Sequence, residues 1–281
     1  MRVAVVGLGL IGGSVALAAR ERLGAEVTGW DHNPDVLQRA KSRGAIVSGA
    51  GSLAGAVAGA DTVVVAVPVR FLHQIVTEVL RSVGTDCAVT DVGSVKGRLA
   101  AAVDDRRFVG GHPLAGVETP GIDNASAALF AGCSWYLTPS AVSDPLLTEQ
   151  VARFITGLGA DPVRIDANLH DRMMAVVSAL PHLFANTLAL AAQSDEFSGL
   201  LQPGPSFRSA TRVAGSSPTL WADVYAANGR VLADTLGAAI TQLEHIRGLL
   251  AAGDVNALRA WHESAAAARG SLYAQRLEEV R

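Results

Sequence analysis

The sequence predicts an α/β fold, with a doubly wound parallel sheet in the first part of the chain and helices alone in the second. Through residue 166, short β-branched runs alternate with stretches of helical length, which is the pattern of such a sheet. Several of the runs are uninterrupted apolar segments, as expected for strands that are buried on both faces. After Asp166 long apolar helical stretches dominate. We therefore predict two domains, residues 1–166 and 167–281.

Strands and helices are expected to alternate in a regular order in the first domain. Strands are predicted at residues 3–6, 26–30, 62–67, 87–91, 108–109, 134–138 and 162–165. Helices are predicted at residues 12–22, 34–43, 70–82, 96–104 and 145–156. The second domain is predicted to hold helices at residues 169–193, 220–252 and 255–279, with a Pro/Gly/Ser segment at 202–218 between the first two.

The composition indicates a protein whose partner is a small molecule. The 281 residues are 49% hydrophobic and 17% charged, with a net charge of -3. This hydrophobicity argues against disorder, and the charge offers no basic surface for nucleic acid or for an anionic membrane. Two cysteines, Cys87 and Cys133, lack metal-ligand spacing, so we expect no metal site, no disulfide framework and a reducing, cytoplasmic location.

The apolar stretch at residues 3–19 resembles a signal peptide, because it follows Arg2 and ends in small residues. It is shorter than the roughly 20 residues that span a bilayer. Glycines also interrupt it at positions 7, 9, 12 and 13. We therefore interpret this stretch as a strand, a turn and a helix of the first domain.

Lysine is scarce in this chain, since the 23 basic residues include only Lys41 and Lys96. GC-rich coding, which replaces lysine by arginine wherever either serves, is the simplest explanation. In such a background, a retained lysine is a candidate for a place that arginine cannot fill. Lys41 lies on a predicted surface helix between Arg39 and Arg43, so the hypothesis concerns Lys96.

A glycine-rich turn follows the first predicted strand and opens the first helix, with the sequence Gly7-Leu8-Gly9-Leu10-Ile11-Gly12. The first glycine permits a tight turn, the second lets a pyrophosphate approach the backbone, and the third lets the helix pack on the strand. The N–H groups at the start of the helix then face the phosphates. We therefore predict a Rossmann-type domain with residues 7–12 in its cofactor site.

Asp31 ends the second predicted strand, 19 residues after Gly12. A carboxylate here accepts hydrogen bonds from both ribose hydroxyls and repels a 2′-phosphate, which favours NAD over NADP. The adjacent His32 could soften this discrimination. The alternative is a glycine turn with Asp31 as a helix cap, and the register of all the elements argues against it.

Two segments follow later strands, at the edge where open parallel sheets bind ligands. Val67 and Pro68 are predicted to turn the chain over the cofactor, although a simple strand end also explains them. The segment 91–96, Asp-Val-Gly-Ser-Val-Lys, carries Asp91 as a cofactor contact and Ser94 as a candidate catalytic hydroxyl. A helix cap is the alternative role for Ser94.

The segment 110–118, Gly-Gly-His-Pro-Leu-Ala-Gly-Val-Glu, carries His112 and Glu118. Glycine and proline fix the backbone on both sides of the imidazole, so we expect His112 in a rigid loop. Histidine suits proton transfer near neutral pH. A structural histidine is the alternative.

The second domain offers further polar candidates. His170-Asp171 begins a helix, and His182 follows twelve residues after His170, so the two histidines need not share a site. Arg208 and Arg212 lie four residues apart and would share a helix face. They could clamp carboxylates, and a solvated face with acidic partners is the alternative.

Together, residues 7–14, 91–96, 110–121, 170–182 and 207–228 resemble the prephenate dehydrogenase (TyrA) family, which includes arogenate and cyclohexadienyl dehydrogenases. The resemblance covers nearly the whole chain in the right order. It implies an oxidoreductase of tyrosine and aromatic amino acid biosynthesis, which uses NAD. Such an enzyme converts prephenate to 4-hydroxyphenylpyruvate, or arogenate to tyrosine, by oxidative decarboxylation.

The resemblance also implies roles for single residues. His112 accepts the proton of the ring hydroxyl as the hydride departs, and Ser94 bonds the same hydroxyl and helps to orient His112. Arg212 matches the arginine that binds a substrate carboxylate, and Glu118 and His182 match positions at the substrate mouth. The helical domain would dimerise, so we expect a homodimer with a small-molecule substrate.

Two positions depart from the family pattern. Members often carry His-Leu-Pro-His where this chain has Ala-Leu-Pro-His, so Ala179 replaces a pocket histidine. They also often carry Asp where Ser209 stands. Both changes leave the choice between prephenate and arogenate open.

Two other classes of function compete with this interpretation. A short-chain imine or β-hydroxyacid reductase shares the two-domain plan, but it would require a catalytic lysine early in the helical domain, and no lysine follows Lys96. A redox-sensing NAD-binding module would require a docking segment. The chain has no basic segment of this kind, and dimer packing explains the apolar helices better.

Overall fold

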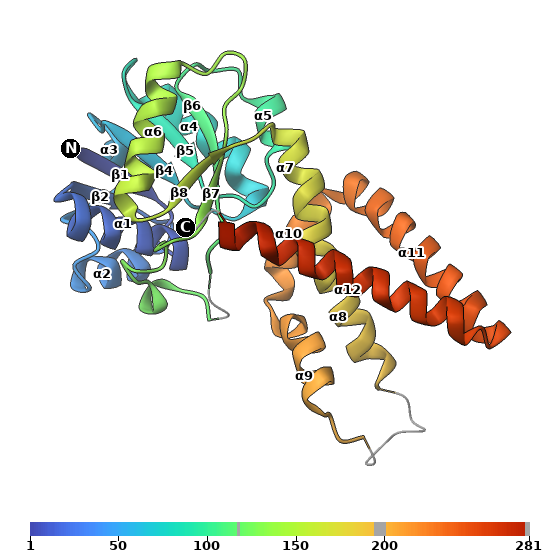
Figure 1. The fold of residues 1–281 in the computed structure, drawn as a ribbon. Helices are drawn as coiled ribbons and strands as arrows, with labels where there is room; N and C mark the ends of the chain where they lie inside the picture. The colour runs from blue at the N-terminus through green and yellow to red at the C-terminus, as the bar shows by residue number, and fades with distance from the viewer. Residues whose placement is uncertain (117–118, 194–200, 279–281) are drawn as a thin grey trace. The chain divides into compact units, whose positions relative to one another are not determined.

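The computed structural model describes residues 1–116, 119–193 and 201–278, with side chains through Leu272. The chain divides into two compact units, Met1–Leu232 and Ala233–Arg281. The first unit holds the sheet and the helices through α10, and the second consists of α12 (Val255–Glu278) and most of α11 (Gly229–Ala252) (Figure 1). The domain boundary placed at residue 166 stays a prediction.

A single sheet of eight strands lies at the centre of the first unit, in the order β3-β2-β1-β4-β5-β6-β7-β8. Its strands are β1 (Arg2–Val6), β2 (Glu26–Trp30), β3 (Ser48–Gly49), β4 (Thr62–Val65), β5 (Ala88–Asp91), β6 (Phe108–Pro113), β7 (Ser134–Thr138) and β8 (Asp161–Arg164). All neighbours are parallel except β6 and β7. The order reverses between β1 and β4, and ligands bind beyond the carboxyl ends of strands at such a point.

Helices cover both faces of the sheet. They are α1 (Leu10–Leu23), α2 (Pro34–Ser42), α3 (Leu53–Val57), α4 (Leu72–Ser82), α5 (Gly97–Ala102) and α6 (Pro145–Leu158). Along β1, Val3 and Val5 pack in one core cluster with residues of α1 and α6, whereas Ala4 and Val6 pack in another with residues of α3 and α4. This alternation explains why the strand is an uninterrupted apolar run. The predicted doubly wound sheet is confirmed.

Several predicted bounds differ from the structure. The strand predicted at 62–67 ends at Val65, and the short elements β3 and α3 were not predicted. The largest difference concerns β6, which extends through Pro113 because the antiparallel β7 pairs with it. His112 therefore lies on a strand opposite Tyr136, rather than in the expected loop. A partner strand that lies more than twenty residues away along the chain is not visible in local sequence.

The helical part of the first unit begins after β8. It contains α7 (Ala167–Met174), a π-helix (Ala175–Ala179), α8 (Leu180–Ala191), α9 (Pro205–Thr211), a 3₁₀ turn (Arg212–Gly215) and α10 (Pro218–Ala227). The π-helix precedes Pro181, which has no N–H group to continue a regular ladder. The helix predicted at 220–252 is interrupted at Asn228, whose side chain turns back to donate to the Asp171 carbonyl (2.9 Å).

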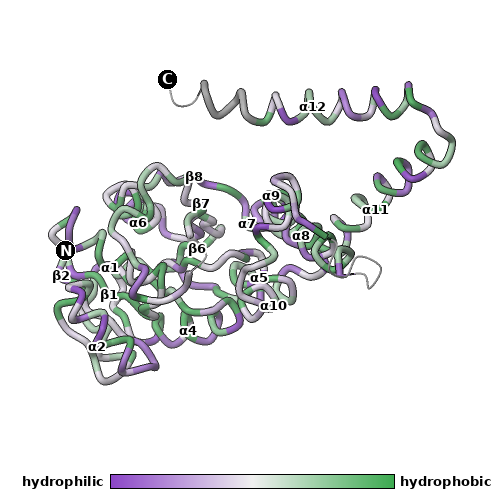
Figure 2. Tube along the Cα trace, turned by 90° about the horizontal axis from the view of Figure 1, so that it is seen from below, coloured by the Kyte–Doolittle hydropathy of each residue, from purple (hydrophilic) through white to green (hydrophobic). Residues whose placement is uncertain are grey.

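Large apolar side chains remain exposed on several helices. They include Phe184, Leu188 and Leu190 on α8, Ile240, Leu243 and Leu250 on α11, and Val255, Trp261 and Leu272 on α12. Figure 2 shows hydrophobic positions along α11 and α12. Among the described residues, Ala167–Ala191 is long and apolar enough to cross a membrane, with a mean hydropathy of 1.5. Helices at a protein interface have the same property.

Candidate active site

The glycine-rich turn joins β1 to α1 at the point where the strand order reverses. Gly7 has a φ of 89°, and a Cβ atom there would lie 2.4 Å from the Ala66 carbonyl oxygen. A Cβ atom on Gly12 would lie 1.9 Å from the Gly7 oxygen, whereas one on Gly9 would meet nothing within 4 Å. No side chain caps α1 at Gly9. The turn therefore leaves open space beside free N–H groups, which fits a dinucleotide phosphate.

Asp31 lies at the end of β2, next to this turn. Its two carboxylate oxygens accept hydrogen bonds from the backbone N–H groups of Leu8 (2.8 Å) and Asn33 (2.9 Å). The exposed His32 places Nδ1 3.2 Å from the same carboxylate. Asp31 is thus held beside the first residues of the turn, where a ribose would lie. Pro68 follows β4, the strand on the other side of β1, and precedes a 3₁₀ turn at Val69–Phe71.

Asp91 and Lys96 form a buried ion pair between the ends of β5 and β6. The Lys96 ammonium donates to Asp91 Oδ2 and to the Gly111 carbonyl (2.8 Å). The N–H groups of Gly93 (2.8 Å) and Gly111 (3.0 Å) donate to the two Asp91 oxygens. The Asp91 and Lys96 side chains are 0% and 1% exposed. This corrects the expectation of a cofactor contact by the Asp91 carboxylate, because it has no accessible surface.

The two glycines before His112 are explained by this packing. A Cβ atom on Gly111 would lie 2.5 Å from the Asp91 carbonyl oxygen, and one on Gly110 would lie 2.4 Å from Thr138 Oγ1. The backbone of β6 can therefore approach β5 and β7 only without side chains at these positions. Burial lowers the pKa of Lys96, and the charge and hydrogen bond of Asp91 offset part of this effect.

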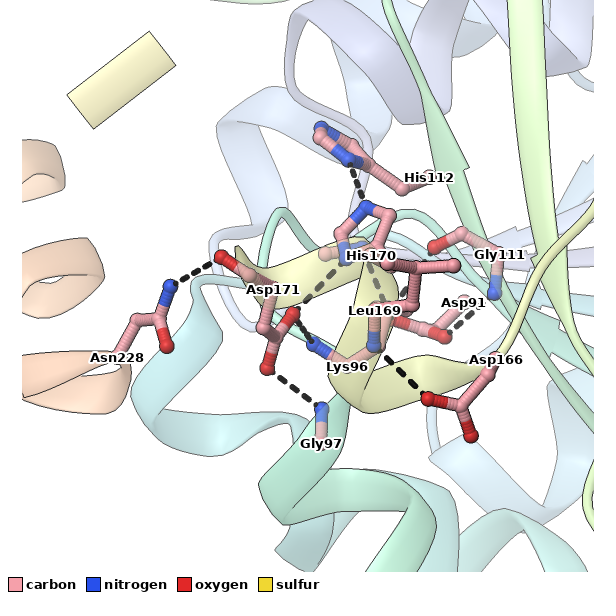
Figure 3. Close-up of polar contacts among 11 residues, drawn as sticks. Asp91, Lys96, Gly97, Gly111, His112, Asp166, Leu169, His170, Asp171 and Asn228 are labelled. Carbon is pink, nitrogen blue, oxygen red and sulfur yellow. Dashed lines mark hydrogen bonds and ion pairs between the residues drawn. The ribbon is translucent and has the colours of Figure 1, made fainter. Parts of the chain in front are cut away.

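His112 follows this pair and contacts a second histidine from the helical part (Figure 3). Its Nδ1 lies 2.9 Å from Nε2 of His170, whose Nδ1 lies 2.8 Å from Asp171 Oδ1. The N–H groups of Lys96 (2.8 Å) and Gly97 (2.7 Å) donate to the two Asp171 oxygens. A chain of hydrogen bonds thus runs from His112 to a buried carboxylate.

The electrostatics keep His112 neutral. Burial lowers its pKa well below the ordinary 6.5, and a positive charge on His170, when that ring is protonated, or on Lys96 lowers it further. A neutral imidazole is the form that can accept a proton. His112 is therefore built as a base that is ready at neutral pH.

The structure does not join Ser94 to His112. Within the described ranges, the half-buried Ser94 hydroxyl makes no hydrogen bond, and the side chain that contacts the His112 ring nitrogen is His170. Ser94 lies in the turn between Asp91 and Lys96, whose ends the ion pair fixes. Its contact with a substrate hydroxyl stays a prediction.

A second group of predicted residues lies on the helices. His182 on α8 stacks on Trp221 of α10, with ring centroids 3.5 Å apart. Burial lowers the pKa of His182, and so does the positive charge of Arg212, which places Arg212 near this stack. Arg208 instead donates from Nε to the Pro203 carbonyl (3.1 Å). Glu118 lies outside the described residues.

Three site residues were given no role by sequence reasoning, namely His170, Asp171 and Trp221. The first two were visible as a His-Asp pair at a helix start, where Asp166 caps the helix by accepting from the Leu169 N–H (2.8 Å). That signal is weak, since any exposed helix can begin in the same way. Trp221 gave no signal in the sequence.

Both halves of the chain match models of known protein domains. The model of the prephenate dehydrogenase nucleotide-binding domain matches residues 15–164, and that of the prephenate dehydrogenase dimerization domain matches residues 166–264. The chain belongs to the prephenate dehydrogenase family. The resemblance seen in the sequence motifs is confirmed, and so are the nucleotide-binding Rossmann domain and the helical C-terminal domain.

Relatives that carry different enzyme names within this family have nearly the same sequence identity to the chain. Prephenate dehydrogenase of Bacillus subtilis is 32% identical over 86% of this chain and 68% of its own length. Cyclohexadienyl dehydrogenase of Zymomonas mobilis is 31% identical over 90% of this chain and 89% of its own. The structure of Aquifex aeolicus prephenate dehydrogenase with hydroxyphenyl propionate and NAD+ has a TM-score of 0.90 at 29% identity. The match covers 97% of this chain and 98% of the Aquifex chain. The family is that of TyrA-type oxidoreductases of tyrosine biosynthesis, and the substrate is not decided by these likenesses.

Proposed function

We propose that this protein is an NAD-dependent prephenate dehydrogenase, which converts prephenate to 4-hydroxyphenylpyruvate and carbon dioxide. The observation that carries the proposal is the neutral, half-buried His112, which lies near the carboxyl end of β6 in a domain with a dinucleotide turn. The similarity to a cyclohexadienyl dehydrogenase favours arogenate, or both compounds, as the second candidate substrate.

NAD, when bound, supplies the acceptor for the hydride that leaves the ring carbon bearing the hydroxyl. The glycine turn of residues 7–12 would hold its pyrophosphate, and Asp31 would accept hydrogen bonds from its ribose. Val67 and Pro68 follow the end of β4, which pairs with β1, and would line the same site. A related structure holds NAD+, which supports this choice of cofactor.

His112 would take the hydroxyl proton on Nε2 while the hydride leaves, because its Nδ1 is occupied by His170. Removing the proton pushes electrons toward the ring carbon and makes loss of the hydride easier. The bond from the ring to its carboxylate then breaks, and its electron pair makes the ring aromatic as carbon dioxide departs. His112 can return the proton to the phenolate oxygen, so the step consumes no net proton.

The remaining site residues would bind and orient the substrate. The Ser94 hydroxyl has no partner within the described chain and can bond the ring hydroxyl. Arg212 would bind a substrate carboxylate, and His182 and Glu118 would line the entrance. Asp91 and Lys96 would hold the backbone of Gly111, and with it His112, in place.

We also propose that the protein acts as a cytoplasmic homodimer that binds neither nucleic acid nor membrane. The family model names residues 166–264 a dimerization domain. The exposed apolar side chains of α8, including Phe184 and Leu188, lie in that range. A second copy covering them would remove this apolar surface from water.

The decisive experiment compares prephenate and arogenate, each with NAD and with NADP, and follows absorbance of the reduced nucleotide. We expect turnover with prephenate and NAD. Preference for arogenate would replace the first candidate substrate with the second. Lack of turnover with either compound would refute the dehydrogenase proposal.

The pH dependence should show an acid limb well below the ordinary histidine value. Because burial lowers the pKa of His112 from 6.5, the base stays neutral until the pH falls through that lowered value. We expect kcat/KM, which reports the free enzyme, to be flat near neutrality and to fall only in this acid range. Circular dichroism should be recorded at each pH to show that the protein stays folded. This control is needed because the unfolded chain binds the His112 proton more tightly than the folded chain does, so the free energy of unfolding decreases as the pH falls below 6.5. An acid limb at or above 6.5 would contradict the role given to His112.

Replacing Arg212→Ala should raise KM for the substrate far more than it lowers kcat. The loss of charged hydrogen bonds to a carboxylate predicts an increase of roughly 10- to 100-fold. Arg208→Ala is the matched control, because the Arg208 guanidinium is exposed and bonds the Pro203 carbonyl. If Arg208→Ala raised KM and Arg212→Ala did not, the carboxylate site would lie at Arg208.

A further inference from the structure

The start of α7 places two buried polar side chains directly behind His112. His170 is 0% exposed and contacts His112 on one side and Asp171 on the other. Figure 3 shows the three side chains in line, with Asp171 extending to the backbone of Lys96 and Gly97. The mechanism above uses His112 and leaves the other two without a role.

The direction of each hydrogen bond follows from the groups that make it. A carboxylate only accepts, so the hydrogen between Asp171 and His170 belongs to Nδ1 of His170. With His170 as the neutral imidazole, which has one donor and one acceptor, its Nε2 accepts from Nδ1–H of His112. The lone pair of His112 is therefore on Nε2, the nitrogen that remains for the substrate.

We propose that His170 and Asp171 are positioning residues that hold His112 in its Nδ1–H tautomer and stabilise the imidazolium that forms when Nε2 takes the substrate proton. This inference rests on the proposed function. A Ser-His-Asp triad uses a buried carboxylate in a similar way, to fix the tautomer of its histidine. Here a second histidine lies between the base and the carboxylate.

The charge changes along this chain support the assignment. When His112 becomes an imidazolium, its Nδ1–H bond to His170 becomes charge-assisted and therefore stronger. The proton moves only from the substrate oxygen to Nε2 and back, and none needs to reach Asp171. His170 and Asp171 are buried and His112 is half-buried, and in such a setting these hydrogen bonds are stronger than in water.

The surrounding contacts fix the carboxylate independently of the histidines. Two backbone N–H groups, from Lys96 and Gly97, bind its oxygens from the nucleotide-binding domain. Asn228 binds the Asp171 carbonyl from the end of α10 (2.9 Å). The carboxylate is thus placed by the packing of α7 between the sheet and α10, and the tautomer of His112 depends on that packing.

The first test reads the tautomer directly, without substrate. Two-bond ¹H–¹⁵N correlation spectra of the ¹⁵N-histidine-labelled protein should show His112, assigned by its loss in His112→Asn, as Nδ1–H with a bare Nε2. In His170→Phe, which removes the acceptor, the spectrum should shift toward Nε2–H. The inference would be overturned if His112 were the Nε2–H tautomer in the wild type. It would also be overturned if the tautomer of His112 were the same in His170→Phe as in the wild type. Because no turnover is involved, this failure differs from failure of the proposed function.

The second test separates positioning from general packing. The His170→Gln side chain can accept from His112 and donate to Asp171, whereas His170→Phe can do neither. We expect kcat to fall on the order of 10²-fold in His170→Phe, within the range of general-base contributions, with little change in KM. The His170→Gln variant should recover most of this loss.

A matched control addresses the stability of α7 itself. The Asp166→Ala variant removes the cap on Leu169 but leaves His170 and Asp171 in place. It should lower Tm while kcat stays near that of the wild type. If Asp166→Ala lost activity as His170→Phe does, or if both His170 variants lost it equally, the role of His170 would be structural only.

Discussion

The His112→Asn variant should lose nearly all turnover while it still binds NAD. The asparagine amide can replace Nδ1–H and donate to His170, but it has no atom in the place of Nε2. The substrate hydroxyl then has no base when the hydride leaves, and general-base contributions of this kind are about 10²- to 10⁴-fold. Steady-state kinetics with the preferred substrate should show this loss in kcat.

The binding and control measurements make this result specific. NAD affinity, followed by calorimetry, should match that of the wild type, because the glycine turn and Asp31 are untouched. His73→Asn is the matched control, since the exposed His73 lies on α4, outside the hydrogen-bonded chain of His112. Substantial activity in His112→Asn would remove His112 from proton transfer, and loss of NAD binding would show that the substitution disturbs the fold.

Part of the site could be read from the sequence because its signals are local. The residues of the turn at 7–12, together with Asp31, lie within one strand, helix and strand, whose spacing is fixed by regular geometry. His112 also lies in a short glycine-rich segment. In each case the chemistry and the backbone requirement are adjacent in the chain.

The remaining contacts could not be predicted because they join distant segments. His112 and His170 are 58 residues apart, and Asp91 and Gly111 are 20 apart. From residue type alone, Asp91 is a carboxylate that could contact the cofactor. In the structure, the pairing of β5 with β6 buries this side chain. The register of β6 with β7 likewise decides that His112 lies on a strand. Such facts depend on tertiary packing, which local patterns do not contain.

The Lys96→Met variant should be strongly destabilised, because methionine removes the cation and leaves the Asp91 carboxylate buried. Breaking a buried ion pair on one side costs roughly 3–5 kcal/mol in the free energy of unfolding. The loss should appear in chemical denaturation, with Tm decreasing in parallel. Because Lys96 also donates to the Gly111 carbonyl, next to His112, kcat should fall as well.

A double variant identifies the buried charge as the cause. In Lys96→Met with Asp91→Asn, no uncompensated charge remains, so much of the stability should return, as for buried pairs replaced by neutral groups. The Lys96→Arg variant keeps the charge but needs more space where Lys96 is 1% exposed, and overpacking costs about 1–3 kcal/mol. The free energy of unfolding of Lys96→Arg should therefore lie between those of the wild type and Lys96→Met. Wild-type stability and kinetics in Lys96→Arg would mean that this lysine, like Lys41, is retained without a need for its shape.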